Sequence, residues 1–400
     1  MTTSLYIHIP FCARKCDYCG FYSIPSFSDD PILDRYVDVL CDDIKTQLAG
    51  PEQSNNANES ILKITNVPTV YSGGGSPSLL GAARTEKLFS CIAGVLPNKC
   101  TEWTVEVNAE STDEAFLNVC RAAGVTRISL GVQSFNEAAR RAIGRRTTQE
   151  ALERGLELLN KYYAGAFSLD LLSGGSADRN ILLNDITKAL SYKPAHISLY
   201  DLCVETGTPL EQKVSDGGFL LPSGDEAAKI WIAGRDMLEN NGYHQYEVSN
   251  FAPYQKESAH NINYWRMGNW LGAGAGATGT IIYKRDNGIY GIRRTIKPNI
   301  EAYISTPPSS HPPAEIEKLD RATLIKESLM MGFRYCGGPD EILFKERFGV
   351  GISDVIPKTY RRWRQRGGNG ALVQNDRIAL TKNGLLFLNA FLTECFLELT

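Results

Sequence analysis

The feature that most constrains the fold is a regular alternation of strand-like and helix-like segments over the first half of the chain. Short runs rich in β-branched and apolar residues recur at 5–9, 67–71, 103–107, 127–132, 167–172 and 196–202. Helical patterns lie between them, the first starting at Asp30-Pro31, and this alternation predicts right-handed βαβ units around a parallel sheet. An open barrel and a doubly wound sheet both fit, and in both the functional site lies at the C-terminal strand ends.

Composition and charge are those of an ordinary globular protein. The chain has 400 residues, of which 43% are hydrophobic and 22% charged, which excludes a mostly disordered chain, a collagen and a coiled coil. The formal charge of −3 gives no general attraction to nucleic acid, so no nucleic-acid partner is expected. No apolar run approaches the roughly 20 residues of a membrane span, and the N-terminus lacks the pattern of a signal peptide, so we expect a cytosolic protein.

The alternation ends near residue 225, where a second region is expected. We predict a first domain over 1–222 and an extension over 223–305, which opens with a helix capped by Ser223 and includes a glycine-rich segment followed by a β-like run to about 292. Proline and serine in 306–313 indicate a linker or exposed loop. A C-terminal unit follows over 314–400.

The C-terminal unit reads as helices followed by a small hairpin, which is typical of a winged helix. Helices are predicted at 314–333, 339–348 and 352–366, and a hairpin at 371–381 that turns at Asn375-Asp376. Its basic stretch, Arg361 to Arg366 with Trp363 inside it, fits either phosphate contacts or a solvated helix face, and the second interpretation is favoured.

Three cysteines near the N-terminus indicate a metal centre. Cys12, Cys16 and Cys19 lie within eight residues as C-x3-C-x2-C, a spacing that suits an iron–sulfur cube whose corners are each held by one thiolate. Three ligands for four irons leave one corner open to chelate the amino and carboxylate groups of a small molecule. The alternative is a zinc site completed by His8 or by a distant residue, as in a zinc-stabilised regulatory protein.

The neighbourhood of these cysteines favours a shielded cluster. Aromatic residues surround the loop: Tyr6, Phe11, Tyr18, Phe21 and Tyr22. The remaining cysteines are expected to be small buried hydrophobes: Cys41, Cys91, Cys100, Cys120, Cys203, Cys336 and Cys395. Gly73, Gly74 and Gly75 follow a strand and let the backbone approach a ligand, although a tight structural turn is the other interpretation.

Together these motifs resemble the radical S-adenosylmethionine (SAM) superfamily, in the branch that contains oxygen-independent coproporphyrinogen III oxidase and the HemW family of haem chaperones. The similarity starts at YIHIPFCARKCDYCGFYS and continues in order through YSGGGSPSLL, TVEVNAES, RISLGVQSFN, IGRRTT, SLDLLSGG, HISLYDLCVETGTPL, YHQYEVSNFA and HNINYW. The resemblance implies an α/β fold, a partial (β/α)6 TIM-like barrel of the radical SAM type with a C-terminal α+β, winged-helix-like extension.

The resemblance also implies the site. Cys12, Cys16 and Cys19 would hold a [4Fe-4S] cluster. SAM would be bound by Tyr6, Tyr18, Gly74, Gly75, Ser76, Glu106, Gln133, Arg145 and Asp170. Haem, carried as cargo for an apo-haemoprotein that is respiratory and membrane-associated, would contact His260, Tyr264 and Trp265. For His260 the other interpretation is a core or loop-capping histidine.

Two features favour the chaperone branch over the oxidase. In the oxidase a fourth cysteine follows the third at the next-but-one position, and that position is Phe21 here. The oxidase also has a sizeable segment before the cluster strand, whereas here that strand is expected already at 5–9. The HNINYW motif also resembles the chaperones. The oxidase, which decarboxylates coproporphyrinogen III with a 5′-deoxyadenosyl radical, is the alternative. A chaperone of this branch need not turn over SAM, so an intact site does not establish an enzyme.

The chain departs from the family pattern at three places. Thr278 replaces a histidine in the glycine-rich GAGATG segment, and Gly20 stands where an aspartate is common. The residues after Asp170 read LLSGG, where the family tends to I-Y-G-L-P, so the loop beside the cofactor is expected to have a different shape.

Overall fold

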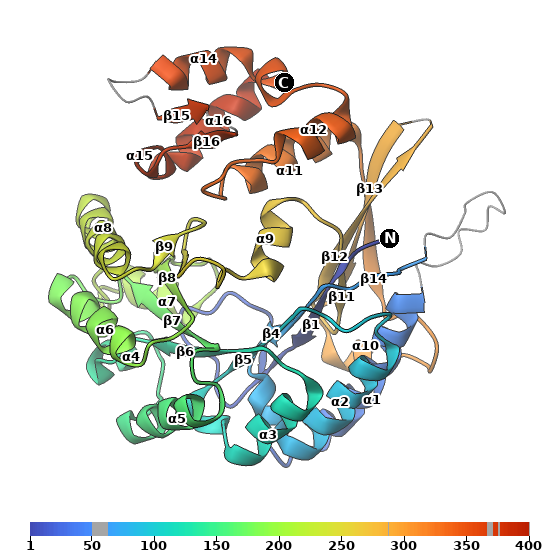
Figure 1. The fold of residues 1–400 in the computed structure, drawn as a ribbon. Coiled ribbons are helices and arrows are strands. Elements are labelled where there is room, and N and C mark those ends of the chain that lie inside the picture. The colour runs from blue at the N-terminus through green and yellow to red at the C-terminus, as the bar shows by residue number, and fades with distance from the viewer. Residues whose placement is uncertain (50–62, 287, 366–370, 375–376, 400) are drawn as a thin grey trace.

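The protein is described by a computed structural model that covers residues 1–49, 63–286, 288–365, 371–374 and 377–399. Six parallel strands lie side by side in sequence order at the centre of one twelve-stranded sheet (Figure 1). They are β1 (Ser4–Ile9), β4 (Thr69–Gly74), β5 (Glu102–Val107), β6 (Arg127–Gln133), β7 (Phe167–Ser173) and β8 (His196–Asp201). The predicted six-stranded parallel unit is therefore confirmed.

Helices cover the outer face of these strands (Figure 1). They are α1 (Ile32–Ala49), α2 (Gly81–Val95), α3 (Glu114–Ala123), α4 (Glu137–Ala142), α5 (Gln149–Tyr162), α6 (Arg179–Ser191), α7 (Pro209–Ser215) and α8 (Gly224–Asn240). The predicted caps are present, since Asp30 Oδ1 accepts the Ile32 amide at 3.0 Å and Ser223 with Glu226 forms a capping box. A continuous apolar core lies between helices and sheet.

The extension continues the same sheet on both sides. Strands β9 (His244–Gln245) and β10 (Asn250–Ala252) lie beyond β8. On the other side β11 (Trp270–Ala273) pairs in parallel with β1, and the antiparallel strands β12 (Thr278–Arg285), β13 (Gly288–Ile296) and β14 (Ala314–Leu319) follow. The short helices α9 (Ala259–Trp265) and α10 (Ile300–Ile304) complete it. Residues 306–313 contain no helix or strand, as expected for a loop.

The helix predicted over 314–333 is wrong in its first part. Residues 314–319 are an edge strand, and the helix α11 (Arg321–Gly332) begins only after Asp320, whose side chain accepts the Thr323 amide at 2.8 Å. Apolar and charged residues alternate at the start of the sequence AEIEKL, which suits a strand at the edge of a sheet. Charged residues on an edge strand oppose pairing with strands of other molecules.

The rest of the C-terminal unit contains the expected helices and hairpin. These are α12 (Glu341–Phe348), α13 (Ile352–Val355), α14 (Pro357–Gln365), β15 (Leu372–Gln374), β16 (Ile378–Leu380), α15 (Lys382–Leu385) and α16 (Leu388–Glu398). The helix predicted over 352–366 is divided, because Pro357 lacks an amide hydrogen and its ring blocks the preceding turn. The predicted hairpin turn lies outside the described residues. Trp363 is buried beside exposed arginines, as in a solvated helix face.

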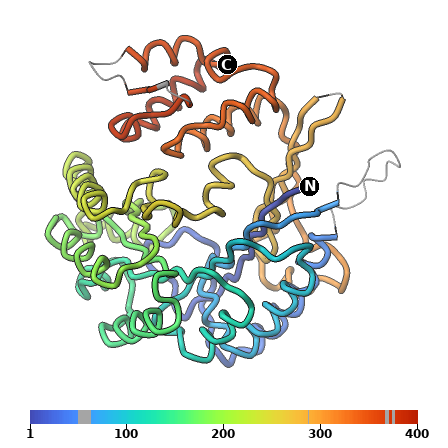
Figure 2. Tube along the Cα trace, in the orientation of Figure 1, coloured from blue at the N-terminus to red at the C-terminus, as the bar shows by residue number. Residues whose placement is uncertain are grey.

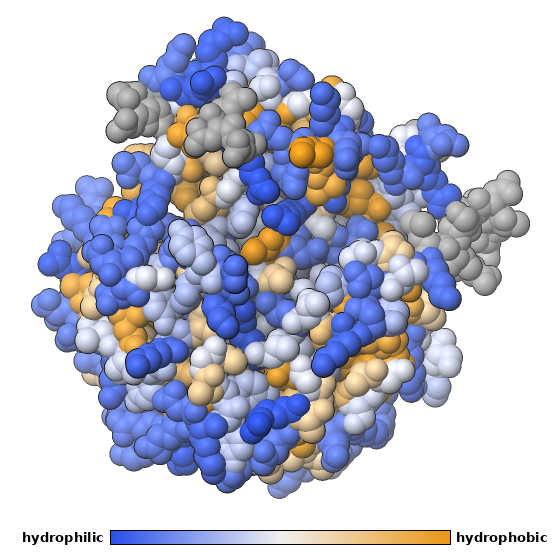
Figure 3. Space-filling model, viewed as in Figure 1, coloured by the Kyte–Doolittle hydropathy of each residue, from blue (hydrophilic) through white to orange (hydrophobic). Residues whose placement is uncertain are grey.

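The C-terminal unit has its own apolar core and packs over α9, which lies between it and the barrel (Figures 1 and 2). The surface seen from this side is mostly hydrophilic, with apolar side chains in separate patches (Figure 3). Within the described part of the chain, no helix has the length and apolar character to cross a membrane.

Candidate functional site

The cysteine loop leaves the C-terminal end of β1. Cys12 lies in the short strand β2 (Phe11–Cys12), which pairs with β3 (Ile24–Pro25), and the Cys19 amide donates to the Cys16 carbonyl at 3.2 Å. All three thiols are half-buried and free. Burial, reinforced by the neighbouring Cys19 and Cys16, raises the pKa of Cys12 to about 11. The loop therefore brings the three sulfurs into one partly desolvated neighbourhood.

Asp17, between the cysteines, fixes this loop to the barrel wall. Its carboxylate pairs with Lys213 at 2.6 Å, and its carbonyl accepts the Leu210 amide at 2.9 Å. Its own amide donates to the Ile143 carbonyl at 3.2 Å. The loop is thus tied to α7 and to the residue after α4, which limits the movement of the thiols.

His8, the residue considered for a zinc site, faces away from that role. It is buried, and its ring nitrogens bond to the Tyr6 hydroxyl at 2.8 Å and to the Tyr22 carbonyl at 2.9 Å. In the described ranges, no three His, Cys, Asp or Glu side chains are arranged to hold a single metal ion. Thiolates around a cube each bind a different iron, so they need not converge on one ion.

The glycine run at the C-terminal end of β4 forms a cradle that no side chain could share. A Cβ on Gly73 would lie 2.5 Å from Glu106 Oε2, and one on Gly74 would lie 2.2 Å from His8 Cε1. Gly74 also has φ +99°, which glycine alone adopts readily. The close approach predicted from the sequence is therefore present, together with a tight turn.

Two carboxylates stand inside the barrel. Glu106 accepts the Tyr71 hydroxyl at 2.7 Å and the Gly74 amide at 2.9 Å, and burial raises its pKa to about 7. Asp170 accepts the hydroxyls of Ser129 and Ser198, and burial raises its pKa to about 6. The negative charge of each carboxylate also raises the pKa of neighbouring tyrosines. Both can bind polar groups of a ligand.

Arg145 supplies a positive charge next to the cysteines. Its Nη2 donates to Asn108 Oδ1 at 2.5 Å and to the Gly131 carbonyl at 2.9 Å, and its Nη1 lies 3.8 Å from Cys16 Sγ. The Nε atom is buried without a partner. Gln133, with φ +66°, packs over the same glycine. Sequence reasoning missed Asn108, although a polar residue directly after a buried strand was a usable signal.

Tyr18 and Ser76 join the cluster loop to this group. The charges of Cys16, Arg145 and Asp170 all act on Tyr18, whose pKa is raised chiefly by burial. The Ser76 amide donates to the Phe11 carbonyl at 2.7 Å, and its hydroxyl bonds to other serines. Of the residues predicted to bind SAM, Tyr18, Ser76 and Arg145 thus lie next to the cysteine loop.

The residues predicted to contact haem lie on α9. His260 is 1% exposed, with Nδ1 bonded to Thr69 Oγ1 at 2.9 Å and Nε2 to the Tyr264 hydroxyl at 3.1 Å. Burial lowers its pKa to about 3. Trp265 is half-buried and its Nε1 has no partner. The structure brings His260 and Tyr264 into direct contact. Trp265 instead lines a separate small cavity beside α12, together with Phe344 and Phe348.

Glu102 holds this helix in place. It accepts Ser258 Oγ at 3.1 Å and the amides of Ala259 and His260, both at 2.9 Å. The two amides belong to the first turn of α9, where backbone N–H groups have no acceptor within the helix. Arg127 Nη2 forms an ion pair with Glu102 Oε2 at 3.4 Å. The position of the motif therefore depends on a residue more than 150 positions earlier.

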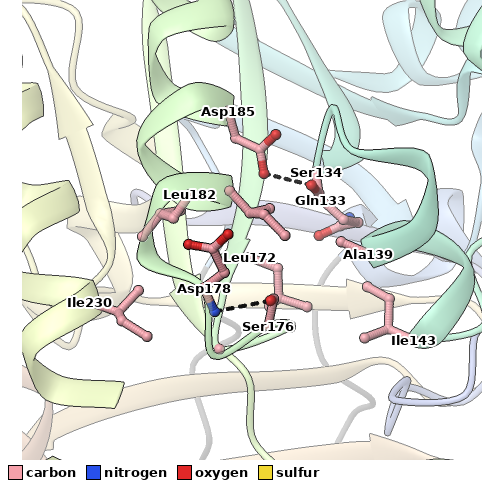
Figure 4. Close-up of a pocket in the computed structure, with 13 residues that line it drawn as sticks. Gln133, Ser134, Ala139, Ile143, Leu172, Ser176, Asp178, Leu182, Asp185 and Ile230 are labelled. Carbon is pink, nitrogen blue, oxygen red and sulfur yellow. Dashed lines mark hydrogen bonds between the residues drawn. The ribbon is translucent and has the colours of Figure 1, made fainter. Parts of the chain in front are cut away.

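A small cavity lies beside the loop that follows β7, where the sequence differs from the family pattern (Figure 4). Its volume is about 20 Å³, room for one water molecule. Gln133, Leu172, Gly174 and Ser176 line it, and Asp185 closes one side by accepting the Ser134 hydroxyl at 2.5 Å. The unusual LLSGG segment thus shapes the wall next to Gln133.

Comparison with known proteins gives the family. The profile of the Radical SAM superfamily matches residues 6–175. A protein named "Heme chaperone HemW" from Lactococcus lactis is 32% identical over 95% of this chain and 94% of its own length, and the Escherichia coli protein of that name is 31% identical over 98% of each. The chain belongs to the HemW-like branch of the radical SAM superfamily.

A solved structure supports the fold of this HemW-like protein. Coproporphyrinogen III oxidase (HemN) from Escherichia coli aligns with a TM-score of 0.78 over 98% of this chain and 89% of its own, at 19% identity. This confirms the radical SAM fold with a C-terminal extension. A zebrafish relative named "Radical S-adenosyl methionine domain-containing protein 1, mitochondrial" is 30% identical over 99% of this chain and 87% of its own length.

Membership of the radical SAM superfamily implies a [4Fe-4S] cluster and SAM, and the residues present fit both. Three thiols on one loop supply the soft donors that iron–sulfur clusters require. Beside them, a glycine cradle that excludes any Cβ and the unpartnered Nε of Arg145 leave space and a donor for a polar ligand.

Two expectations for individual side chains need revision, and one departure from the family pattern can be placed. Phe21 is 69% exposed, so it does not shield the cluster loop. Cys203 is exposed because it lies in the loop beyond β8, and of the other single cysteines only Cys41, Cys120 and Cys395 are fully buried. Thr278 faces β13, where its hydroxyl bonds to Thr295 at 3.1 Å.

Proposed function

We propose that this chain is a haem chaperone of the radical SAM type, which binds a [4Fe-4S] cluster, SAM and haem and delivers haem to apo-haemoproteins. The similarity of 30–32% to proteins named heme chaperone HemW, which includes the C-terminal unit, carries this proposal. Recipients that are respiratory and membrane-associated, and a cytosolic location, stay predictions from the sequence.

In this proposal Cys12, Cys16 and Cys19 hold the cluster, whose open iron would chelate the amino and carboxylate groups of SAM. The chain's own groups orient that ligand. The glycine cradle offers backbone groups, Arg145 attracts a carboxylate, and Glu106 with Asp170 accepts hydrogen bonds from hydroxyl or ammonium groups. The other proposed SAM residues line the same space: Tyr6, Tyr18, Ser76 and Gln133. Because these groups are already fixed by hydrogen bonds, little ordering is needed on binding.

Haem is proposed to contact His260, Tyr264 and Trp265. Both ring nitrogens of His260 are occupied, so iron ligation requires His260 to give up its bond to Thr69 or to Tyr264. The low pKa of His260, about 3, keeps the ring neutral, which is the form that binds iron. Haem capture by this motif therefore implies a movement of α9 or of the side chain.

The alternative is oxygen-independent coproporphyrinogen III oxidase. Radical chemistry would require the same cluster and SAM residues, so the proposed site is compatible with this alternative as well. The likeness to HemN is one of fold, at 19% identity. The two functions differ in what they do with the porphyrin, because the oxidase forms protoporphyrinogen IX and the chaperone retains haem.

The decisive experiment uses anaerobically reconstituted protein. We expect stoichiometric iron and acid-labile sulfide, an EPR signal on reduction, and saturable haem binding without formation of protoporphyrinogen IX from coproporphyrinogen III. Formation of that product without haem retention would assign the oxidase instead. Stoichiometric zinc without sulfide would overturn both. Cys16→Ser should abolish the cluster and lower SAM affinity, whereas Cys100→Ser, at a half-buried cysteine just before β5 and so at the opposite end of the parallel strands, should do neither.

A further inference from the structure

Helices α1 and α2 pack against each other on the outer wall of the barrel in a constant register. Three successive contacts, with partners 50, 49 and 50 residues apart, fix it: Asp34–Arg84, Asp38–Lys87 and Cys41–Cys91. The first is an ion pair at 2.7 Å and the second is a direct ion pair. One turn further along, the Cys91 thiol donates to the Cys41 carbonyl at 3.6 Å. The two cysteines therefore face each other across the helix interface.

The two thiols also differ in reactivity. Cys41 is 6% exposed, whereas Cys91 is half-buried and reaches the surface. A hydrogen bond from the Cys41 thiol, helped by the charge of Lys45, lowers the pKa of Cys91 to about 7. The same contact raises the pKa of Cys41. Cys91, the accessible sulfur, is thus the more acidic and the more reactive of the two, and Cys41 is the inner thiol, the arrangement found in oxidisable cysteine pairs.

We propose that Cys41 and Cys91 form an oxidisable pair that a peroxide converts into a disulfide joining α1 to α2. The Cys91 thiolate attacks hydrogen peroxide, so that an S–O bond forms, the O–O bond breaks and hydroxide leaves. The Cys41 sulfur then attacks this sulfenic acid, forming the S–S bond and breaking the S–O bond, and the leaving hydroxide takes the Cys41 proton to become water. Two electrons pass from the sulfurs to the peroxide, and the products are the disulfide, this water and the hydroxide of the first step, which takes a proton from solvent.

The position of the pair links it to the cluster strand. Tyr36, on α1, donates its hydroxyl to the carbonyl of His8 at 2.9 Å, and His8 is on β1 before the cysteine loop. A bond between α1 and α2 would hold this wall of the barrel when peroxide is present. A cross-link between helices that already pack in register restricts the unfolded chain, so oxidation should raise the melting temperature by a few degrees.

The test exposes the anaerobically prepared full-length protein to a small excess of hydrogen peroxide. Free thiols are alkylated, and the chain is digested with trypsin without reduction. Trypsin leaves each thiol in its own peptide, residues 36–45 for Cys41 and 88–99 for Cys91. We expect these two peptides to appear joined, with a mass two hydrogens below their sum, and to separate on reduction.

Matched variants make the outcome decisive. Cys91→Ser should lose the joined peptide, and Cys100→Ser, at another half-buried cysteine, should keep it. Cys41→Ser should accumulate a dimedone-reactive sulfenic acid at Cys91, because the second sulfur is gone. If Cys91 in the parent stays fully alkylatable, or passes to the sulfinic acid without a joined peptide, the proposal is overturned, whatever the protein does with haem.

Discussion

The rings of His260 and Tyr71 pack together with their centroids 5.2 Å apart, and the hydroxyl of Tyr71 bonds to Glu106. A single side chain thus separates the motif proposed for haem from a carboxylate proposed for SAM. Tyr71 therefore contacts both places, with its ring at His260 and its hydroxyl at Glu106, a role that its position in the glycine motif did not reveal.

Replacing Tyr71 by Phe should separate the two contacts. The ring packing against His260 stays, and the hydrogen bond to Glu106 is lost. A net hydrogen bond to a charged group is worth about 1.5–3 kcal/mol, so we expect SAM affinity, measured by calorimetry on reconstituted protein, to fall roughly tenfold or more. Haem titration should be nearly unchanged. Equal loss of both affinities would contradict the separation.

His260→Ala should reduce stability as well as haem binding. It removes the partner of the Tyr264 hydroxyl, and a buried polar group left without a partner costs about 1–3 kcal/mol. The Thr69 hydroxyl keeps its bond to Ser4. Urea unfolding of the anaerobic protein should show the loss. His244→Ala, at a half-exposed histidine paired with Glu257, is the control and should change stability far less. Retained haem affinity in the folded variant would remove His260 from the haem site.

Glu102→Ala should loosen α9. The change removes the acceptor for three donors at the start of that helix, and loss of a helix cap costs about 0.5–2 kcal/mol. Hydrogen exchange should then speed up in residues 259–265 more than in the barrel strands. Glu102→Gln keeps one acceptor oxygen and should lie between parent and alanine variant. Unchanged exchange in α9 would show that its packing alone fixes it.

Glu247 should make stability depend on pH. Burial raises its pKa to about 7 in the folded chain, above the value near 4.3 for an unfolded one. The folded state therefore binds the proton more tightly, so this contribution to stability is full below pH 4 and is lost as pH rises to 7. The loss amounts to about 3 kcal/mol. Glu247→Gln keeps an oxygen for the Ser249 amide, at 3.0 Å, and should remove this dependence. The check is the difference in unfolding free energy between variant and parent, which should grow between pH 4 and 7 and then level off.

Gly74→Ala should disrupt the cradle. The new Cβ would overlap His8, and φ +99° adds backbone strain. We expect loss of SAM binding and a lower melting temperature. Gly94→Ala is the matched control, since nothing lies within 4 Å of its added Cβ inside α2 and the change should be neutral or stabilising. A normal SAM affinity in Gly74→Ala would show that the cradle does not contact the ligand.

The sequence was sufficient to predict the six central strands because short runs rich in β-branched and apolar residues recur between helical patterns, an alternation typical of parallel sheets. The strand at 314–319 was missed because its glutamates and lysine suit an exposed helix equally well, and only its pairing with β13 decides between them. The occupied ring of His260 and the contact from Glu102 could not be predicted either. Both depend on which residues meet across more than 150 positions, and no local pattern encodes that.

The place of β1 in the sheet has a consequence for synthesis. One neighbour, β4, follows within 70 residues, but the other, β11, begins at Trp270, which pairs with Ser4. At roughly 5–20 residues per second the ribosome delivers that second neighbour only after tens of seconds. Until then one edge of β1 is unpaired and the strand that leads to the three thiols has no partner on that side. The nascent protein therefore exposes the three thiols proposed to hold the cluster before the sheet beside them can form.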